Sequence, residues 1–382
     1  MKRSVLLVSV ILVVLLAGCA GLPGDNGTTA DDDRDDSTPE EDAPTTADDA
    51  EEDPDSGDTD DPADDEGETP ATAEGDLEIH HIDVGQADAT LLITPAGETV
   101  LIDTGDFRQR GAGVIEYLED QDIDRIDHLV ATHAHADHIG GHDAVIEWAE
   151  TEGDGIGAAY DSGVPHTTRT YERYLDAIEE YDVDLFTVEE GDELPIDGDL
   201  DALVVNPPAG DSGSNLHYNS VSLVFEFGEF TYLTTGDAER DAEERMIDEW
   251  AGELDADMYQ AGHHGSRTSS TPAFLDVVTP EVVIISSAYE SQYGHPHDEV
   301  LDAFADRNVE TYWTGVHGDV VVTANGTGDI DIATTEAFST DAADLRAEKP
   351  SDDQQSIEQP LIGNAPLGHS PDYTPQQEAS IG

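Results

Sequence analysis

The sequence predicts one mixed α/β domain over residues 76–338, and three observations lead to this prediction. Strand-like and helix-like stretches alternate along this region of the 382-residue chain, as they do in layered α/β domains. Its length, roughly 260 residues, is enough for a single large layered domain. The segments before and after it contain hardly any large apolar side chains, so neither can bury a core of its own.

Strands are expected where short apolar runs end in glycine or a polar residue, and helices where apolar residues recur at helical spacing. The expected strands are Leu77 to Val84, Ala89 to Thr94, Thr99 to Ile102, Ile126 to Ala131, Ala202 to Asn206, Ser222 to Phe227, Phe230 to Thr234, Met258 to Ala261, Val282 to Ser286 and Thr311 to Trp313. The expected helices are Gly111 to Asp120, Ile139 to Trp148, Thr168 to Glu180, Ala238 to Trp250, Pro272 to Val277 and Asp298 to Arg307. Functional residues should then lie at strand ends and on the loops after them.

Residues 1–19 have the pattern of a secretion signal. Lys2 and Arg3 precede an apolar run, and small residues lead to Cys19, the only cysteine. The segment Leu16 to Cys19 resembles a lipoprotein box, in which the cysteine is lipidated after cleavage. An uncleaved membrane anchor is the alternative, although the apolar run is short for a full span. In either case we expect the rest of the chain to be extracellular and anchored to the outer face of the membrane.

The two flanking segments are expected to be disordered. Asp, Glu, Thr, Pro and Gly dominate residues 20–75, and like charges would extend this acidic linker and hold the domain off the membrane. Residues 339–382, with their Gln, Pro and Asp, are expected to form a loose tail.

The chain is strongly acidic, with 89 acidic against 14 basic side chains and a formal net charge of -75. Such an imbalance destabilises a compact chain in dilute salt, whereas screening near molar ionic strength shortens the reach of the repulsion to about 3 Å. The linker supplies part of the charge, yet the acidic excess continues through Asp176 to Glu193 and Asp237 to Asp257. We therefore expect a halophilic protein. No basic groove for nucleic acid is visible in the sequence.

The stretch Thr132 to Gly141, THAHADHIGG, places three histidines and an aspartate within six positions after a strand-like run. Neutral imidazoles and a carboxylate are ligands that borderline divalent ions such as zinc prefer. They can converge only if the backbone turns sharply, and Gly140 and Gly141 allow that turn. A solvated polar loop is the alternative interpretation.

Further candidates lie at the ends of later strands. Asp237 ends the strand-like YLTTGD and suits either a cation bridge or the N-cap of the next helix. The segment GHHGS offers His263 and His264 as a ligand pair, with Ser266 as a substrate contact. His295, in YGHPH, lies in a loop before a helix.

Two early strands also end in a carboxylate and a glycine. Asp103, in LIDTG, is expected to orient metal ligands of the histidine loop through hydrogen bonds. Asp83, in DVGQADA, is a second candidate of this kind, although Asp83 and Asp88 suit turns equally well.

Taken in order, seven motifs resemble those of the metallo-β-lactamase superfamily, and within it the hydrolase domain of the ComEC-type competence proteins and their stand-alone relatives. They are DVGQADA, LIDTGD, THAHADHIGG, NSVSLVF, TYLTTGDAE, GHHGS and YGHPH. The resemblance covers residues 77–325. It implies a four-layered αββα sandwich with a dinuclear metal site at one edge of the β layers.

The resemblance also implies a set of ligands. His133 and His135 would hold one metal, Asp137 and His138 would hold the second, and Asp237 would bridge the two. The pair His263-His264 would supply a further ligand, which we assign to His264, with His263 near the substrate.

The sequence departs from the superfamily pattern at one ligand position. Many members carry a histidine just before the strand that begins here at Ser222, whereas this chain has Asn219, as the competence-type branch does. The first metal is then less fully ligated, which leaves both zinc and manganese open, and His217 is one residue that can compensate. The chain also has no apolar segment after Cys19 like the membrane channel of the competence proteins, so we do not expect it to transport DNA.

Two divalent ions would activate a water for in-line attack on a phosphoester. Asp137 would orient this nucleophile and His263, or a water, would protonate the leaving group. His166 and His295 are either phosphate contacts or ordinary loop histidines.

The leading functional hypothesis is a secreted phosphodiesterase or nuclease that acts on extracellular DNA. The first alternative keeps the site but takes a small-molecule or cell-surface phosphoester, a lactam or a thioester. The second is a metal-binding surface protein without catalysis. The sequence gives no oligomeric state.

Overall fold

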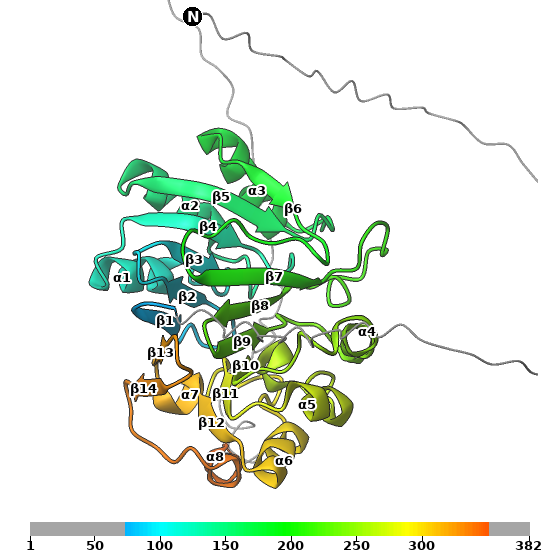
Figure 1. Ribbon diagram of the computed structural model, residues 1–382. Coiled ribbons are helices and arrows are strands. Elements are labelled where there is room, and N and C mark those ends of the chain that lie inside the picture. Colours follow the sequence, from blue (N-terminus) through cyan, green and yellow to red (C-terminus); the bar gives the residue numbers. More distant parts are fainter. Residues whose placement is uncertain (1–72, 351–382) are drawn as a thin grey trace, which may run out of the picture. The chain divides into compact units, whose positions relative to one another are not determined.

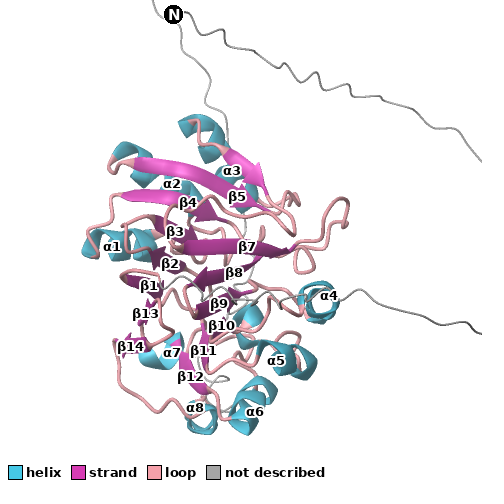
Figure 2. Cartoon of the chain, viewed as in Figure 1, coloured by secondary structure: helices cyan, strands magenta, loops and turns pink. Residues whose placement is uncertain are grey.

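The computed structural model describes residues 73–350, which form two β-sheets packed face to face with helices on both outer faces (Figure 1, Figure 2). The four layers follow the order helix, sheet, sheet, helix, because separate groups of buried side chains fill the space between the sheets and the space under each helical layer. The predicted αββα sandwich is therefore confirmed.

The first sheet has the strand order β14-β13-β1-β2-β3-β4-β5-β6. Its strands are β1 (Asp76–His81), β2 (Thr90–Ile93), β3 (Thr99–Ile102), β4 (Arg125–Val130), β5 (Gly155–Asp161), β6 (Leu185–Thr187), β13 (Val320–Asn325) and β14 (Ile330–Thr334). Strands β3, β4, β5 and β6 pair in parallel, so their carboxyl ends lie at the same edge of the sheet.

The second sheet has the order β12-β11-β10-β9-β8-β7. Its strands are β7 (Leu200–Asn206), β8 (Ser222–Phe227), β9 (Phe230–Thr234), β10 (Met258–Gln260), β11 (Val282–Ile285) and β12 (Glu310–Trp313). Here β9, β10, β11 and β12 pair in parallel, so this sheet also presents a row of carboxyl ends.

Helices cover the two outer faces. The helices α1 (Ala112–Asp120), α2 (His142–Thr151) and α3 (Arg169–Tyr181) pack on the first sheet. The helices α4 (Arg240–Trp250), α5 (Pro272–Val278), α6 (Asp298–Arg307) and α8 (Ala342–Glu348) pack on the second. Two short elements remain, the 3₁₀ turn η1 (Gly262–Gly265) and α7 (Thr314–His317).

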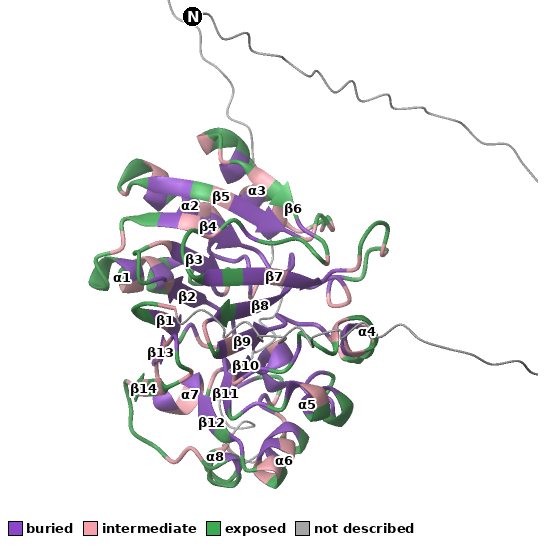
Figure 3. Cartoon of the chain, in the orientation of Figure 1, coloured by how far each residue is buried: buried purple, intermediate pink, exposed green. Residues whose placement is uncertain are grey.

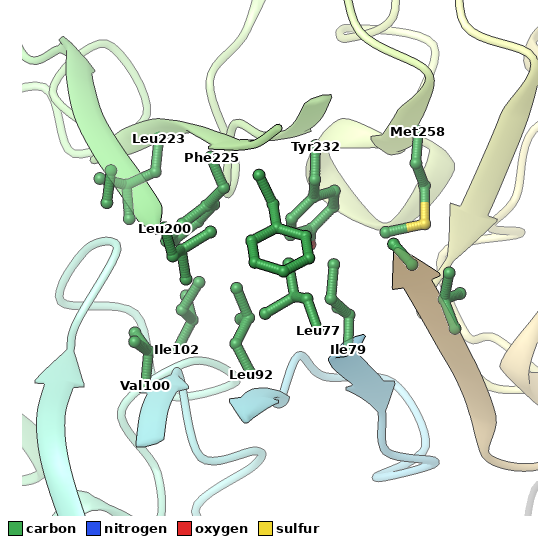
Figure 4. Packing of buried hydrophobic residues seen from close by; sticks show 14 of the residues in the cluster. Leu77, Ile79, Leu92, Val100, Ile102, Leu200, Leu223, Phe225, Tyr232 and Met258 are labelled. Carbon is green, nitrogen blue, oxygen red and sulfur yellow. The ribbon is translucent and has the colours of Figure 1, made fainter. Parts of the chain in front are cut away.

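Side chains alternate between two apolar environments along the central strands. In β11, Val282 and Ile284 face the space between the sheets, whereas Val283 and Ile285 face the helices. Both faces are buried, which explains the nearly continuous apolar runs (Figure 3). Figure 4 shows residues of the inter-sheet core, contributed by β1, β2 and β3 on one side and by β7, β8, β9 and β10 on the other. This core fixes how the two rows of strand ends meet.

The predicted element list is incomplete. It omits β5, β6, β13 and β14, together with α7 and α8. Strand β5 was missed because its sequence, GIGAAYD, is rich in glycine and alanine, which have little strand propensity. The second helix begins at His142 rather than Ile139, because the loop through Gly140 and Gly141 is still turning there.

The predicted domain boundary at residue 338 is wrong. Helix α8 follows it, with the Asp341 side chain accepting a hydrogen bond from the Ala343 amide at its start. Leu345 is fully buried in the core under α6, and Arg346 pairs with Asp302 at 2.6 Å. A helix this short is stable only when it packs against the rest of the fold. The polar composition of the surrounding segment gave no sign of that packing.

Residues 1–72 and 351–382 lie outside the described residues. The predicted signal, Cys19, nearly all of the linker and most of the tail are among them. Within residues 73–350, no helix combines the length and apolar character needed to cross a membrane.

Glu243 is a buried carboxyl group that ties α4 to the segment before α5. Its side chain accepts hydrogen bonds from the backbone amides of Ser270 and Thr271. Burial raises the pKa of Glu243 from 4.5 to about 7, although these amides and Arg240 favour the carboxylate. Folding therefore takes up a proton at this side chain between these two pH values.

We predict that this carboxyl group destabilises the protein as the pH rises from about 4.5 to about 7, by on the order of 3 kcal/mol. Glu243→Gln should remove this part of the slope, whereas Glu244→Gln, at an exposed position of the same helix, should keep it. Denaturant unfolding in high salt at a series of pH values measures the difference. Parallel stability curves for all three proteins would contradict the prediction.

Candidate metal centre

The predicted ligands lie on three loops that follow strands. The loop after β4 carries His133, His135, Asp137 and His138, the loop after β9 carries Asp237, and η1 after β10 carries His263 and His264. Strand β4 belongs to the first sheet, and β9 pairs with β10 in the second (Figure 1). Because the sheets pack face to face, the ends of these strands meet at one edge of the sandwich.

Two glycines allow close packing around the histidine loop, Gly140 against the loop after β3 and Gly236 in the loop that carries Asp237. A Cβ atom on Gly140 would lie 2.1 Å from the backbone nitrogen of Phe107. Gly236 has a φ of +48°, and a Cβ atom there would lie 2.5 Å from Ser220 Oγ and 2.8 Å from Thr132 Cβ. Any side chain at position 236 would therefore push the loop with Asp237 away from the histidine loop.

The first group of potential ligands consists of His133, His135, His217 and Asp237. One ligand atom from each lies within 4.8 Å of the others. His133 Nε2 lies 2.8 Å from His135 Nδ1 and 3.5 Å from Asp237 Oδ2. Three imidazoles and a carboxylate at this spacing can hold one divalent cation.

The second group consists of Asp88, His138, Asp237 and His264, at the same spacing. Asp137 lies beside it, with its Oδ2 atom 3.5 Å from His264 Nε2. Asp237 belongs to both groups, so the two positions share a carboxylate.

The unpaired atoms of the second group fit a bound cation. His138 Nε2, His264 Nε2 and Asp237 Oδ1 are buried and have no hydrogen-bond partner among residues 73–350. His138 Nε2 lies 3.2 Å from Asp237 Oδ1 without the direction a hydrogen bond needs, and His264 Nε2, at 3.7 Å, is too far for one. Each unpaired buried group costs about 1–3 kcal/mol. A cation at this point satisfies all three.

Neighbouring groups hold these ligands in place. Asp103 Oδ2 lies 2.6 Å from His138 Nδ1, and its Oδ1 accepts the Thr132 amide at 2.9 Å. His264 Nδ1 lies 3.1 Å from the carbonyl oxygen of Ser286. In each case the second ring nitrogen has a protein partner, which leaves Nε2 free to face the cation position.

The metal-free protonation states follow from burial and charge. Burial lowers the pKa of His133, and that of His135 to about 4, so both are neutral ligands at pH 7. Burial opposes the charged form of His264 too, but Asp237 and Asp137 raise its pKa to about 9. Nearby histidines hold the pKa of Asp237 well below its usual range despite burial. A cation that binds here must displace a proton from His264.

The backbone of η1 is strained. His263 and His264 have φ values of +52° and +56°, a left-handed conformation that is uncommon for residues other than glycine. Such strain persists where the surroundings enforce it and clusters at functional sites. Here His264 lies in the second group, and His263 Nε2 lies 3.5 Å from Asp237 Oδ2.

The cation positions open into a cavity of ≈ 650 Å³. The predicted contact residues His166, Ser266 and His295 line it, as does His263. His295 stacks on His264 with ring centroids 6.2 Å apart, and the His166 ring lies 5.8 Å from that of His135.

Two predicted residues do not face the ligands. Asp83 is exposed, and its side chain accepts a hydrogen bond from the Gly85 amide, so it shapes a turn. Asp88, from the same segment, is the buried carboxylate that reaches the second group. Its Oδ2 atom lies 3.7 Å from His264 Nδ1. Asn219 is buried and bonds to its own loop.

Two site residues were not assigned from the sequence. Asp88 was treated as a turn residue, although its position between two alanines in a buried segment was a usable signal. Glu239, whose Oε1 lies 3.4 Å from both His217 Nδ1 and His263 Nδ1, had no such signal, because it also suits a helix start.

Comparison with known proteins identifies the family of this fold and ligand arrangement. The family model described as "Metallo-beta-lactamase superfamily" matches residues 82–288, more than half of the 382-residue chain. The chain belongs to the metallo-β-lactamase superfamily. The matched segment contains all the ligand positions described above.

Individual proteins are also similar to this chain. "ComE operon protein 3" of Bacillus subtilis is 29% identical over 265 residues, which cover 65% of this chain and 33% of that protein. "Competence protein ComA" of Neisseria gonorrhoeae is 28% identical over 249 residues, 65% of this chain and 32% of that protein. The chain thus spans about a third of the length of these relatives. Among solved structures, the metallo-beta-lactamase fold protein YhfI of Bacillus subtilis has a TM-score of 0.43 at 11% identity, covering 68% of this chain and all of that one.

We predict that Asp103→Asn weakens metal binding about 10-fold to 100-fold, because the amide no longer attracts the proton on His138 Nδ1 as a carboxylate does. Asp106→Asn, which alters a carboxylate bonded to its own loop, is the matched control. Competition titration against a metal-chelating dye gives both affinities. Equal affinity for wild type and Asp103→Asn would show that this hydrogen bond does not support the site.

Proposed function

We propose that this superfamily member is a secreted, membrane-anchored phosphodiesterase with two divalent metal ions, zinc or manganese, which acts on extracellular DNA. The observation that carries the proposal is the pair of ligand groups that share Asp237 beside an open cavity. Similarity to competence proteins supports nucleic acid as the substrate. The pattern of residues 1–19 supports secretion and anchoring.

The residues divide between two metal positions. His133 and His135 would hold the first cation, Asp137, His138 and His264 the second, and Asp237 both. When bound, such a pair of cations supplies a nucleophilic water at neutral pH and neutralises phosphoryl oxygens.

Asp137 and His263 would act on the substrate side. His264 and His138 hold the pKa of Asp137 below its usual range in spite of burial, so Asp137 is a carboxylate that can orient a water. His263 lines the cavity, and its Nε2 lies 3.5 Å from Asp237 Oδ2. Burial lowers the pKa of His263. At pH 7 its neutral ring would therefore donate a hydrogen bond to the leaving oxygen without carrying a full positive charge.

The acidic surface demands an unusual mode of DNA binding. Among the residues that line the cavity, Arg267 is the one arginine or lysine, and Glu299 lies 3.3 Å from its Nη1. In a halophilic setting the phosphate attraction of basic residues is screened in any case. Stacking is not screened in this way. Tyr293, 57% exposed at the cavity, has its ring 5.7 Å from that of His295 and offers a face to a nucleobase.

The net charge of -75 is the observation that favours the alternative, a smaller phosphoester, because a short substrate meets less repulsion. Parallel assays with DNA and with small phosphoester, lactam and thioester substrates separate these functions.

We predict manganese- or zinc-dependent cleavage of DNA by the purified protein near molar salt, lost by more than about a hundredfold in His138→Ala and Asp137→Ala. Asp120→Ala, an exposed aspartate of α1, should retain full activity. Agarose and denaturing gels detect the cleavage. No DNA cleavage under any metal condition would refute the nuclease proposal, and cleavage that survives His138→Ala would refute the site.

We further predict that Tyr293→Leu removes a preference for nucleoside substrates. Stacking on one base contributes about 1–3 kcal/mol, so KM for a thymidine 5′-(p-nitrophenyl phosphate) should rise about 5-fold to 150-fold. KM for methyl p-nitrophenyl phosphate, which has the same leaving group and no base, should not change. Tyr293→Phe should resemble the wild type. An equal effect on both esters would mean that Tyr293 does not contact the base.

A further inference from the structure

His217 lies on the loop between β7 and β8, outside every motif from which ligands were predicted. Its ring centroid is 4.8 Å from that of His135 and 5.8 Å from that of His133. One of its ring nitrogens lies within 4.8 Å of the ligand atoms of His133, His135 and Asp237. This loop therefore delivers an imidazole to the first cation position.

Asn219, two residues later, is directed away from that position. Its Nδ2 donates to the Asn215 carbonyl oxygen at 2.8 Å, and its Oδ1 accepts the Ser212 hydroxyl in a short hydrogen bond. The backbone N–H of Asn219 also donates to the Asn215 carbonyl oxygen at 3.1 Å. Both ends of this buried side chain are thus used within residues 212–219. They close the loop that presents His217.

We propose that His217 is the third imidazole ligand of the first metal position, together with His133, His135 and Asp237, and that Asn219 shapes the loop without binding metal. This inference rests on the proposed metal-dependent function. It gives the first position four protein ligands in spite of the asparagine at the usual histidine position.

Glu239 orients the proposed ligand. Its Oε1 lies 3.4 Å from His217 Nδ1, so a carboxylate faces one ring nitrogen of this histidine. A carboxylate in that place fixes the orientation of a ligating imidazole and increases its basicity. Glu239 follows Asp237 by two residues, so one loop supplies both the shared carboxylate and the support for His217.

A competing arrangement groups His217 with Glu239 and His263 around a third cation. All three of these residues are half-exposed, whereas the first group includes the buried His133 and Asp237. Water competes less for a cation held by buried ligands. The first group is therefore the better position for His217.

The proposal has a consequence for metal selectivity. The first position would have three imidazoles and one carboxylate, whereas the second group has two imidazoles with the carboxylates of Asp88 and Asp237, and Asp137 lies beside it. Imidazole-rich sites favour zinc, and carboxylate-rich sites accept manganese more readily. We expect zinc to be retained longer at the first position.

The test measures bound metal rather than activity. The full chain is loaded with zinc, dialysed against a weak chelator and analysed by inductively coupled plasma mass spectrometry, and the visible spectrum of the cobalt-loaded protein is recorded in parallel. We expect two equivalents for the wild type, about one for His217→Ala, and the loss of one cobalt component. His135→Ala should give the same result.

His166→Ala is the matched control, since this histidine lines the same cavity but belongs to neither ligand group. It should retain two equivalents, as should Asn219→Ala. Glu239→Gln should weaken the first position about 10-fold to 100-fold. If His217→Ala fails to fold by circular dichroism, His217→Gln replaces it in the same measurements.

Three outcomes are decisive. Two equivalents and an unchanged cobalt spectrum in His217→Ala, with one equivalent lost in His135→Ala, would overturn the proposal. Three equivalents in the wild type, with only the third lost in His217→Ala, would place His217 at the competing site and overturn it too. A wild-type protein that binds no metal would refute the proposed function itself, before His217 is tested.

Discussion

The carboxylate of Asp237 is almost completely buried, and nitrogen atoms of His133, His138, His263 and His264 lie 3.2 to 3.7 Å from its oxygens. A buried carboxylate is costly without positive charge nearby, and most of these nitrogens are themselves buried. The histidines come from one loop of each sheet, so the carboxylate and its partners meet only if the two sheets pack in this register. Gly236 provides the close approach to the histidine loop that the contact requires. The inter-sheet core and the site therefore depend on each other.

The acidic composition determines how the few basic side chains of the protein are used. Most arginines of the described region have a carboxylate within 4 Å, as Arg245 has Glu190 and Arg110 has Asp143. Their charges stabilise the fold locally and are not available to a polyanion. Under the proposed function, positive charge at the cavity would then come from bound cations, because Arg267 is itself paired with Glu299. Under this function, phosphate binding would depend on the metals, and the rest of the surface could stay acidic.

Metal ligands could be predicted most clearly where they lie close together in the sequence. The histidine loop was recognisable because its four ligands lie within six positions, and their strand-end location followed from the apolar run before them. Asp237 was ambiguous by itself, since it also suited an N-cap. The structure has Glu239 at the N-cap of α4, so Asp237 is free to face the histidines. Asp88 and His217 join the site only through tertiary packing, and their local sequence gives a much weaker signal than the histidine loop does.

Glu239 connects the two sides of the centre. Its carboxylate faces His217, beside the first position, and His263, whose Nε2 reaches towards Asp237. One carboxylate cannot orient both rings independently, because a shift of His217 changes the position of the Glu239 charge relative to His263. If His217 and His263 have the proposed roles, Glu239 would couple ligation at the first position to hydrogen bonding on the substrate side, and both roles would depend on the loop that begins at Asp237.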